Sequence, residues 1–233
     1  MPILLLSNSS SDAGYLTHAR DWIAEAIGDA RRVAFVPYAA VTFSYDDYTA
    51  RVAAALDGLG LTITGVHSAA DPAQAVRDAD AVFVGGGNTF HLLREMYALG
   101  LVAAVRERVA KGAPYVGWSA GANVAGPTVR TTNDMPIVEP PSFNSLALVP
   151  VQINPHYTDA HPPGHRGETR AERLAEFVAA NPDAPVVGLP EGTAVRIVGG
   201  VTLLGDGAAR VFDTASPQGR EAGPGEAEAL FGA

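Results

Sequence analysis

Short, uninterrupted apolar runs alternate with helical patterns through the first half of the chain. The run at residues 3–6 precedes an amphipathic segment at 15–27, and the run at 81–84 precedes helical patterns at 90–99 and 101–110. Strands that are buried on both faces of a parallel sheet are continuously apolar, and helices connect them. The alternation therefore predicts an α/β fold in three layers, with a parallel sheet between two layers of helices.

The other elements follow from the same signals. Further strands are predicted at residues 32–37, 61–66, 113–117, 148–153 and 185–189, and Asp46 or Asp47 could cap a helix that runs to Leu59. Glycine-separated β-rich runs after Thr193 predict a small antiparallel C-terminal region. Without a repeat or a long linker, residues 1–233 are interpreted as one domain, and composition predicts weak order after about Ser216.

Composition limits the classes of partner and of chemistry. The net charge of −9 argues against nucleic acid and against an anionic membrane surface as partners. The absence of cysteine excludes disulfides and a thiolate nucleophile. No apolar run approaches the length of a membrane span, so we expect a soluble, cytoplasmic protein. No motif calls for a metal or another cofactor.

The segment Gly117-Trp118-Ser119-Ala120-Gly121 lies between an apolar run and a helical pattern. A serine in such a strand-to-helix turn has an exposed hydroxyl, and the amide of the next residue lies at the helix start. The pattern predicts Ser119 as a nucleophile and the Ala120 amide as one oxyanion donor. The alternative is a serine that only caps a helix.

A nucleophilic serine needs a base, and His156 is the best placed of the six histidines. It follows Pro155 at a predicted strand end, and ligands bind at the carboxyl ends of parallel strands. The imidazole in turn needs an acceptor that fixes its tautomer. Both Asp134 and Glu191 qualify. Glu191 shares the strand-end edge with Ser119 and His156, whereas Asp134 lies in a predicted loop over 127–144 and could instead hold a substrate ammonium.

Two further features could bind an anion. The turn Gly85-Gly86-Gly87 could supply a second oxyanion donor at Gly86 or, as we prefer, at Gly87. Thr169-Arg170-Ala171-Glu172 has the form of a capping box. Arg170 at the first helical position would then offer a bidentate site for a carboxylate, although a solvated arginine is an equally ordinary reading.

Segments spread along the chain resemble the peptidase E family, up to about Phe212. They are residues 4–9, 84–90, 117–123, 130–136, 152–156, 167–170 and 188–192. Peptidase E is the α-aspartyl dipeptidase, a serine hydrolase related in fold to class I glutaminases. The resemblance therefore implies a flavodoxin-like parallel sheet and a metal-free serine dipeptidase.

The resemblance also implies roles for single residues. It implies that Asp-X dipeptides are cleaved through an acyl-enzyme on Ser119, with His156 as the base. It places the third triad member at Asp134 or at Glu191, and the aspartyl side chain on Arg170. Asn88 and Thr132 are further candidates for substrate binding. The expected partner is a small acidic dipeptide, and the oligomeric state stays open between monomer and homodimer.

Two alternatives remain at this stage. One is a cyanophycinase-like hydrolase, which would act on an aspartyl-arginine polymer. The other is a non-catalytic module that binds carboxylates or nucleotides on a flavodoxin-like sheet. The chain has no G-x-x-x-x-G-K-[ST] pattern, so the signal for a nucleotide is weak.

Overall fold

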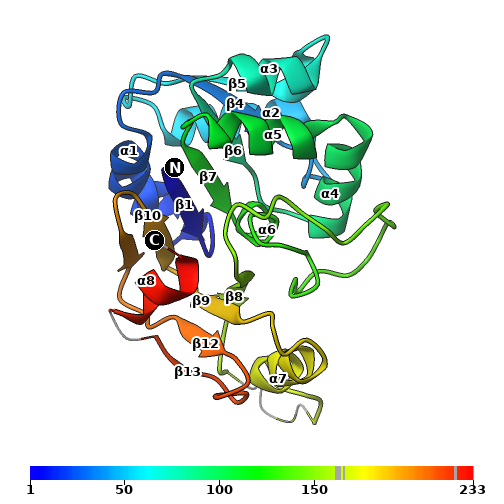
Figure 1. Cartoon of the computed structure of the whole chain (residues 1–233). Coiled ribbons are helices and arrows are strands. Elements are labelled where there is room, and N and C mark those ends of the chain that lie inside the picture. The colour runs from blue at the N-terminus through cyan, green and yellow to red at the C-terminus, as the bar shows by residue number, and fades with distance from the viewer. Residues whose placement is uncertain (161–163, 165, 223–224, 233) are drawn as a thin grey trace.

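A large, mostly parallel sheet lies between two layers of helices (Figure 1). The computed structural model describes residues 1–160, 164, 166–222 and 225–232. The sheet has seven strands in the order β11-β10-β1-β7-β6-β4-β5. The parallel strands are β1 (Ile3–Leu6), β4 (Arg32–Val36), β5 (Thr62–Gly65), β6 (Ala81–Val84) and β7 (Tyr115–Trp118). The predicted α/β class is confirmed.

Each parallel strand contributes side chains to two hydrophobic cores, because successive side chains point to opposite faces of a sheet. On one face, Phe35 and Phe83 pack with α1 (Arg20–Ile27) and α2 (Tyr45–Ala55). The opposite face is covered by α3 (Pro72–Asp78), α4 (Thr89–Ala98) and α5 (Leu101–Ala110). The continuous apolar runs in the sequence thus reflect burial on both sides.

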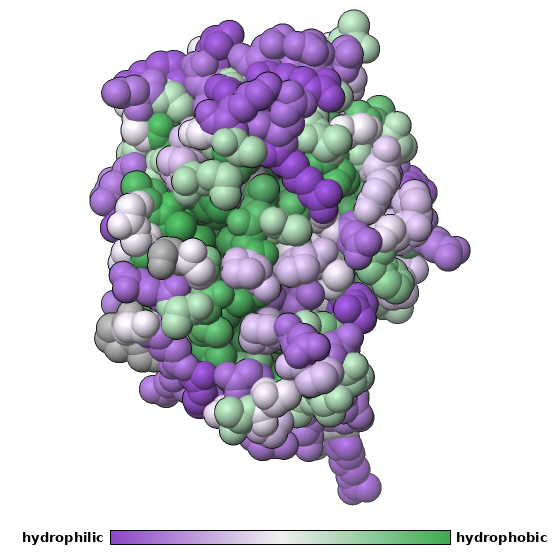
Figure 2. Space-filling view, viewed as in Figure 1, coloured by the Kyte–Doolittle hydropathy of each residue, from purple (hydrophilic) through white to green (hydrophobic). Residues whose placement is uncertain are grey.

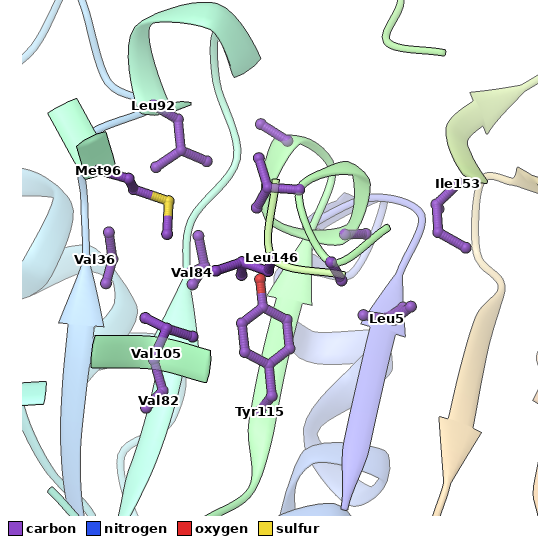
Figure 3. Close-up of a cluster of buried hydrophobic side chains, with 14 of the residues drawn as sticks. Leu5, Val36, Val82, Val84, Leu92, Met96, Val105, Tyr115, Leu146 and Ile153 are labelled. Carbon is purple, nitrogen blue, oxygen red and sulfur yellow. The ribbon is translucent and has the colours of Figure 1, made fainter. Parts of the chain in front are cut away.

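Figure 3 shows the second of these cores. Val82 and Val84 of β6 lie in one buried cluster with Leu92 and Met96 of α4 and with Val105 of α5. All five side chains are fully buried. This packing fixes the position of β6, and therefore of the glycine-rich turn that follows it.

Four strands form a second sheet, which the sequence did not predict. β8 (Gln152–Tyr157) pairs in parallel with β9 (Val186–Pro190), and β12 (Arg210–Phe212) and β13 (Arg220–Glu221) extend it antiparallel. Strands at 148–153 and 185–189 were expected in the large sheet. They cannot join it, because β10 (Ala194–Ile197) occupies the free edge of β1 and β11 (Val201–Leu204) lies beyond β10.

The start of β8 also differs from the prediction. Leu146 and Leu148 donate their backbone N–H groups to the carbonyls of Val124 and Ala125, so this stretch wraps around the end of α6 (Ala120–Asn123) instead of pairing as a strand. β8 therefore begins at Gln152 and contains His156 within it. α7 (Arg170–Ala180) covers the second sheet, with Leu174 and Val178 packed on it.

Local differences have simple causes. The helix expected at 15–27 begins only at Arg20, after the short strands β2 (Ser10–Ser11) and β3 (Gly14–Tyr15) and the 3-10 turn η1 (Thr17–Ala19). α2 is capped by Ser44, not by Asp46 or Asp47, since the Ser44 hydroxyl accepts the Asp47 N–H at 3.0 Å. α3 was not predicted; Asp71 caps it and Pro72 begins it. A second 3-10 turn, η2, spans Val66–Ser68.

The tail after Ser216, for which composition predicted weak order, contributes β13 and the helix α8 (Glu226–Phe231). Ala227 and Phe231 of α8 are buried. Figure 2 shows apolar residues gathered in the middle of the face on which the N-terminus and α8 lie. In the part of the chain that the structure describes, no helix is both long and apolar enough to cross a membrane.

The turn after β7 packs directly on β6. α6 (Ala120–Asn123) starts after Ser119, and a Cβ at Gly121 would overlap the backbone carbonyl of Val84. A Cβ at Gly117 would likewise overlap the carbonyl of Gly121. The two glycines of the G-x-S-x-G pattern are therefore required by close backbone contacts.

We expect Gly121→Ala to lower the free energy of unfolding by about 3 kcal/mol or more, because the methyl group must push α6 away from β6. Chemical denaturation measures this change. Gly225→Ala is the matched control: nothing lies within 4 Å of its added Cβ, and the loss is expected to stay below about 1 kcal/mol, the ordinary cost of alanine at an N-cap position. Equal losses in the two variants would contradict the steric explanation.

Candidate active site

Three side chains predicted from the sequence form one hydrogen-bonded series. Ser119 Oγ lies 2.9 Å from His156 Nε2, and His156 Nδ1 lies 2.7 Å from Glu191 Oε1. The carboxylate only accepts hydrogen bonds, so Nδ1 carries a proton and Nε2 is free to accept the serine hydroxyl. A serine, a neutral imidazole and an orienting carboxylate in this order can activate the hydroxyl for attack on an acyl carbon.

Ser119 has an unusual backbone conformation. Its φ is 53° and its ψ −115°, in a region that residues other than glycine rarely adopt. The N–H of Ser119 donates to the carbonyl of Leu6 at 3.1 Å, which ties the turn to the neighbouring strand β1. Strained backbone of this kind is concentrated at functional sites, where the surrounding structure holds it in place.

His156 is also placed by an irregular backbone. The pairing of β8 with β9 shifts between Pro155 and Tyr157, and His156 between them has a φ of 54°. A bulge of this kind re-aims one side chain out of its strand. The N–H of His156 donates to the hydroxyl of Ser7 at 2.9 Å, and that hydroxyl donates to the carbonyl of Leu189 at 2.8 Å.

Residues that follow β1 also hold the turn that carries Glu191. Asn8 Oδ1 accepts the N–H of Gly192 at 2.8 Å, and the N–H of Ser7 donates to the carbonyl of Thr193 at 2.9 Å. Sequence reasoning did not single out Ser7 or Asn8 as site residues. Their position at the carboxyl end of a predicted strand was the signal that could have found them.

Asp134 lies elsewhere in the structure. Its Oδ2 accepts the backbone N–H of Thr89 at 2.7 Å and the Thr89 hydroxyl at 2.6 Å, at the start of α4. A carboxylate there is favoured by the helix dipole. Both ring nitrogens of His156 have other partners, so the structure brings Glu191, and not Asp134, to the imidazole.

Asn88 and Thr132 have partners within the protein. Asn88 Oδ1 caps α4 by accepting the N–H of His91 at 3.0 Å, and its Nδ2 donates to the carbonyl of Met135 at 2.9 Å. The Thr132 hydroxyl lies 3.2 Å from Asp134 Oδ2. These side chains hold the loop at 130–136 against α4. His161 and His165, two of the six histidines considered as the base, lie outside the described residues.

Arg170 begins α7, and the expected capping box between Thr169 and Glu172 is formed. Its Nη1 is buried without a hydrogen-bond partner among the described residues. Burial, and then the nearby charge of Arg173, lower the pKa of Arg170. The guanidinium lines a hollow together with Thr132 and Asp134. A buried N–H group without an acceptor is costly, so the position of Nη1 suits this hollow to an anionic group.

The glycine-rich turn after β6 passes beside the nucleophile. A Cβ at Gly86 would lie 2.9 Å from the Cβ of Ser119. In the part of the chain that the structure describes, the N–H groups of Gly87 and Ala120 have no hydrogen-bond partner. Free backbone donors next to a nucleophile can stabilise an oxyanion. No group of three or more His, Asp or Glu side chains in the same described ranges could hold a metal ion.

Known proteins are similar to this chain over most of its length. The model of peptidase family S51 matches residues 3–204. Curated relatives named peptidase E, from Shewanella amazonensis and from Shewanella baltica strain OS195, are each 53% identical over 211 residues. The aligned region covers 90% of this chain, and 90% and 88% of the two relatives.

Solved structures show the same fold. A crystal structure of a putative peptidase E from Listeria monocytogenes EGD-e has a TM-score of 0.66 at 22% identity, over 88% of this chain and 98% of the other. The structure of a peptidase from an acI-B1 actinobacterium also has a TM-score of 0.66, at 18% identity, over 91% and 90% of the two chains.

We expect Glu191→Gln to slow the labelling of Ser119 by a fluorophosphonate about 10- to 1,000-fold, because the amide no longer holds the imidazole in the required tautomer. Loss of a fully buried partner costs more, about 10⁴-fold, but the Glu191 side chain is 66% exposed. Asp134→Asn is the matched control, with labelling within about three-fold of wild type. A larger loss in Asp134→Asn would assign the supporting carboxylate to Asp134.

Proposed function

Because this chain belongs to peptidase family S51, we propose that Ser119, His156 and Glu191 act as the catalytic triad of its hydrolytic reaction. The chain is a serine-type dipeptidase, and its resemblance to peptidase E is confirmed by the family model and by the curated relatives. Its substrates are dipeptides with an N-terminal aspartate, in accord with the role of peptidase E. The observation that supports the triad is the unbroken hydrogen-bonded series from Ser119 to Glu191.

The first half of the reaction forms an acyl-enzyme. Ser119 Oγ attacks the carbonyl carbon of the aspartyl residue while His156 Nε2 takes the hydroxyl proton. The amides of Gly87 and Ala120 donate to the oxygen that becomes negatively charged. When the tetrahedral intermediate collapses, the C–N bond breaks and His156 gives its proton to the leaving amine. Glu191 stabilises the imidazolium that exists between these two transfers.

The second half releases aspartate. Water attacks the ester carbon of the acyl-enzyme and transfers a proton to His156 Nε2. The same two amides hold the second oxyanion, and the proton then returns to Ser119 as the ester bond breaks. Every proton that moves is carried by His156, so no other acid or base is required.

Two charges recognise the substrate in this proposal. The half-buried guanidinium of Arg170 binds the side-chain carboxylate of the N-terminal aspartate, which supplies the acceptor that Nη1 lacks. Asp134 lines the same hollow, and its Oδ1 is available to the α-ammonium. A substrate that lacks either group would leave one of these two half-buried charges without its counter-charge, and the site therefore selects against it.

The two alternatives from the sequence fit the findings less well. Relatives of over 50% identity are peptidases, which argues against a non-catalytic module and gives no support to a polymer hydrolase. A serine that only caps a helix would not require a hydrogen-bonded imidazole. The proposal retains a cytoplasmic location and a small acidic dipeptide as the partner, and it leaves the choice between monomer and homodimer to measurement.

Ser119→Ala is expected to reduce the hydrolysis of Asp-Leu to below one per cent of wild type, since removal of a triad nucleophile typically costs about 10⁶-fold in kcat. Release of leucine measures the rate, and circular dichroism checks that the variant is folded. Residual hydrolysis above a few per cent would show that another group attacks the substrate.

Arg170→Ala is expected to lower kcat/KM for Asp-Leu about 100-fold or more, because a charge-assisted bidentate contact is lost. Residual cleavage of Asn-Leu, whose side chain has no charge to pair, should change far less. The ratio of kcat/KM for the two dipeptides measures the effect. Arg77→Ala is the matched control, because it removes an arginine that pairs with Glu107 and does not line this hollow. Equal losses on both dipeptides would contradict a carboxylate-binding role for Arg170.

A further inference from the structure

The hydroxyl of Tyr48 joins the glycine-rich turn to the nucleophile turn from within the core. Tyr48 lies in α2 and is 3% exposed. Its hydroxyl lies 2.9 Å from the carbonyl oxygen of Gly86 and 3.0 Å from Nε1 of Trp118. Gly86 is next to the candidate oxyanion donor Gly87, and Trp118 directly precedes Ser119. One phenol thus contacts both the glycine-rich turn and the nucleophile turn, and it does not face the substrate.

The direction of these hydrogen bonds is fixed by chemistry. An indole N–H can only donate, and a carbonyl oxygen can only accept. The Tyr48 hydroxyl therefore accepts from Trp118 and donates its single proton to Gly86. Tyr15 donates to the same hydroxyl at 3.3 Å. Burial raises the pKa of Tyr48, which favours the protonated hydroxyl that donates to Gly86.

The Gly86–Gly87 peptide is the one that needs such a restraint. In a trans peptide the carbonyl of one residue and the N–H of the next point in opposite directions. Glycine on both sides lets this unit rotate at little steric cost. A rotation of this peptide would turn the Gly87 N–H away from the reacting carbonyl and bring the Gly86 carbonyl oxygen into its place. A hydrogen-bond donor would then be replaced by a group that repels an oxyanion. Among the described residues, Tyr48 is the only hydrogen-bond partner of the Gly86 carbonyl.

We propose that Tyr48 is a positioning residue for the oxyanion hole: its hydroxyl holds the Gly86 carbonyl in the core, which keeps the Gly87 N–H directed at the reacting carbonyl. This role rests on the proposed function, because it needs Ser119 to form a tetrahedral intermediate. Tyr48 does not touch the substrate, so it acts on the stabilisation of the transition state and not on binding.

Gly85 supports the same assignment. A Cβ at this position would lie 2.7 Å from the Tyr48 hydroxyl oxygen and 2.8 Å from Cζ of the ring. Its φ is not in the left-handed region, so the backbone alone would accept alanine here. The position needs glycine because the phenol must come close. Gly85→Ala therefore displaces the hydroxyl without removing it, and provides a second, independent variant.

The test separates transition-state stabilisation from binding. Tyr48→Phe keeps the ring and removes the donor. We expect kcat on Asp-Leu to fall about 10- to 100-fold with KM within about three-fold of wild type, as for a weakened oxyanion contact. The affinity for aspartic α-aldehyde, which Ser119 converts into a tetrahedral adduct, should fall by a similar factor. The affinity for the product aspartate should not change. Gly85→Ala should show the same pattern if Tyr48→Phe does not fold.

Tyr97→Phe is the matched control, because it also removes a tyrosine hydroxyl that donates to a backbone carbonyl, that of Asn144 at 2.9 Å. It should leave kcat within about two-fold of wild type. An unchanged kcat in folded Tyr48→Phe, or an equal loss of aspartate affinity, would overturn the proposal. If wild type cleaves no Asp-X dipeptide, the substrate assignment fails by itself. The rate at which a fluorophosphonate labels Ser119, which also depends on the oxyanion donors, then decides the role of Tyr48.

Discussion

The geometry of the candidate active site depends on one hydroxyl, that of Ser7, where the two sheets meet. It accepts the N–H of His156 and donates to the carbonyl of Leu189, so it joins β1 of the large sheet to β8 and β9 of the small one. Ser119 belongs to the large sheet, whereas His156 and Glu191 belong to the small sheet. The proposed catalytic role of the 2.9 Å hydrogen bond between Ser119 and His156 requires that the relative position of the two sheets be fixed to a fraction of that distance. Asn8 and the Ser7 backbone add further bonds at the same junction.

The restraints around this junction act on successively smaller parts of the structure: strands, then a helix, then single peptide units. Apolar packing on both faces fixes β6 and β7, and hence the two turns at their carboxyl ends. Backbone contacts without room for a Cβ then fix α6 against β6. Buried hydroxyl groups of Tyr48 and Ser7 fix single peptide units within that frame. Hydrogen bonds of this kind contribute only about 1 kcal/mol each to stability. Their importance lies in geometry, since they decide where donors and acceptors point.

Much of the site could be predicted because its signals are local. The strand-to-helix turn around Ser119 is set by neighbouring glycines, and the capping box that presents Arg170 is contained within four residues. The choice between Asp134 and Glu191 could not be made in this way, since it depends on which loop reaches the imidazole. The second sheet was missed for a related reason: strand order is decided by β10, which takes the edge of β1. Tyr48 has no sequence signal, because its partner is a backbone carbonyl distant in the chain.

Ser119 and His156, the two groups that exchange a proton in the proposed reaction, both have a positive φ. Outside glycine, such a backbone costs on the order of 1–3 kcal/mol at each position. Selection for stability alone would favour glycine at both positions, and a chain that lost its activity would be free to acquire glycine there. A serine and a histidine at these two conformations therefore exchange stability for a role in the proposed reaction. Leu16 and Ala147 also have a positive φ and take no part in it, so the angle marks a site only together with the hydrogen bonds between the side chains.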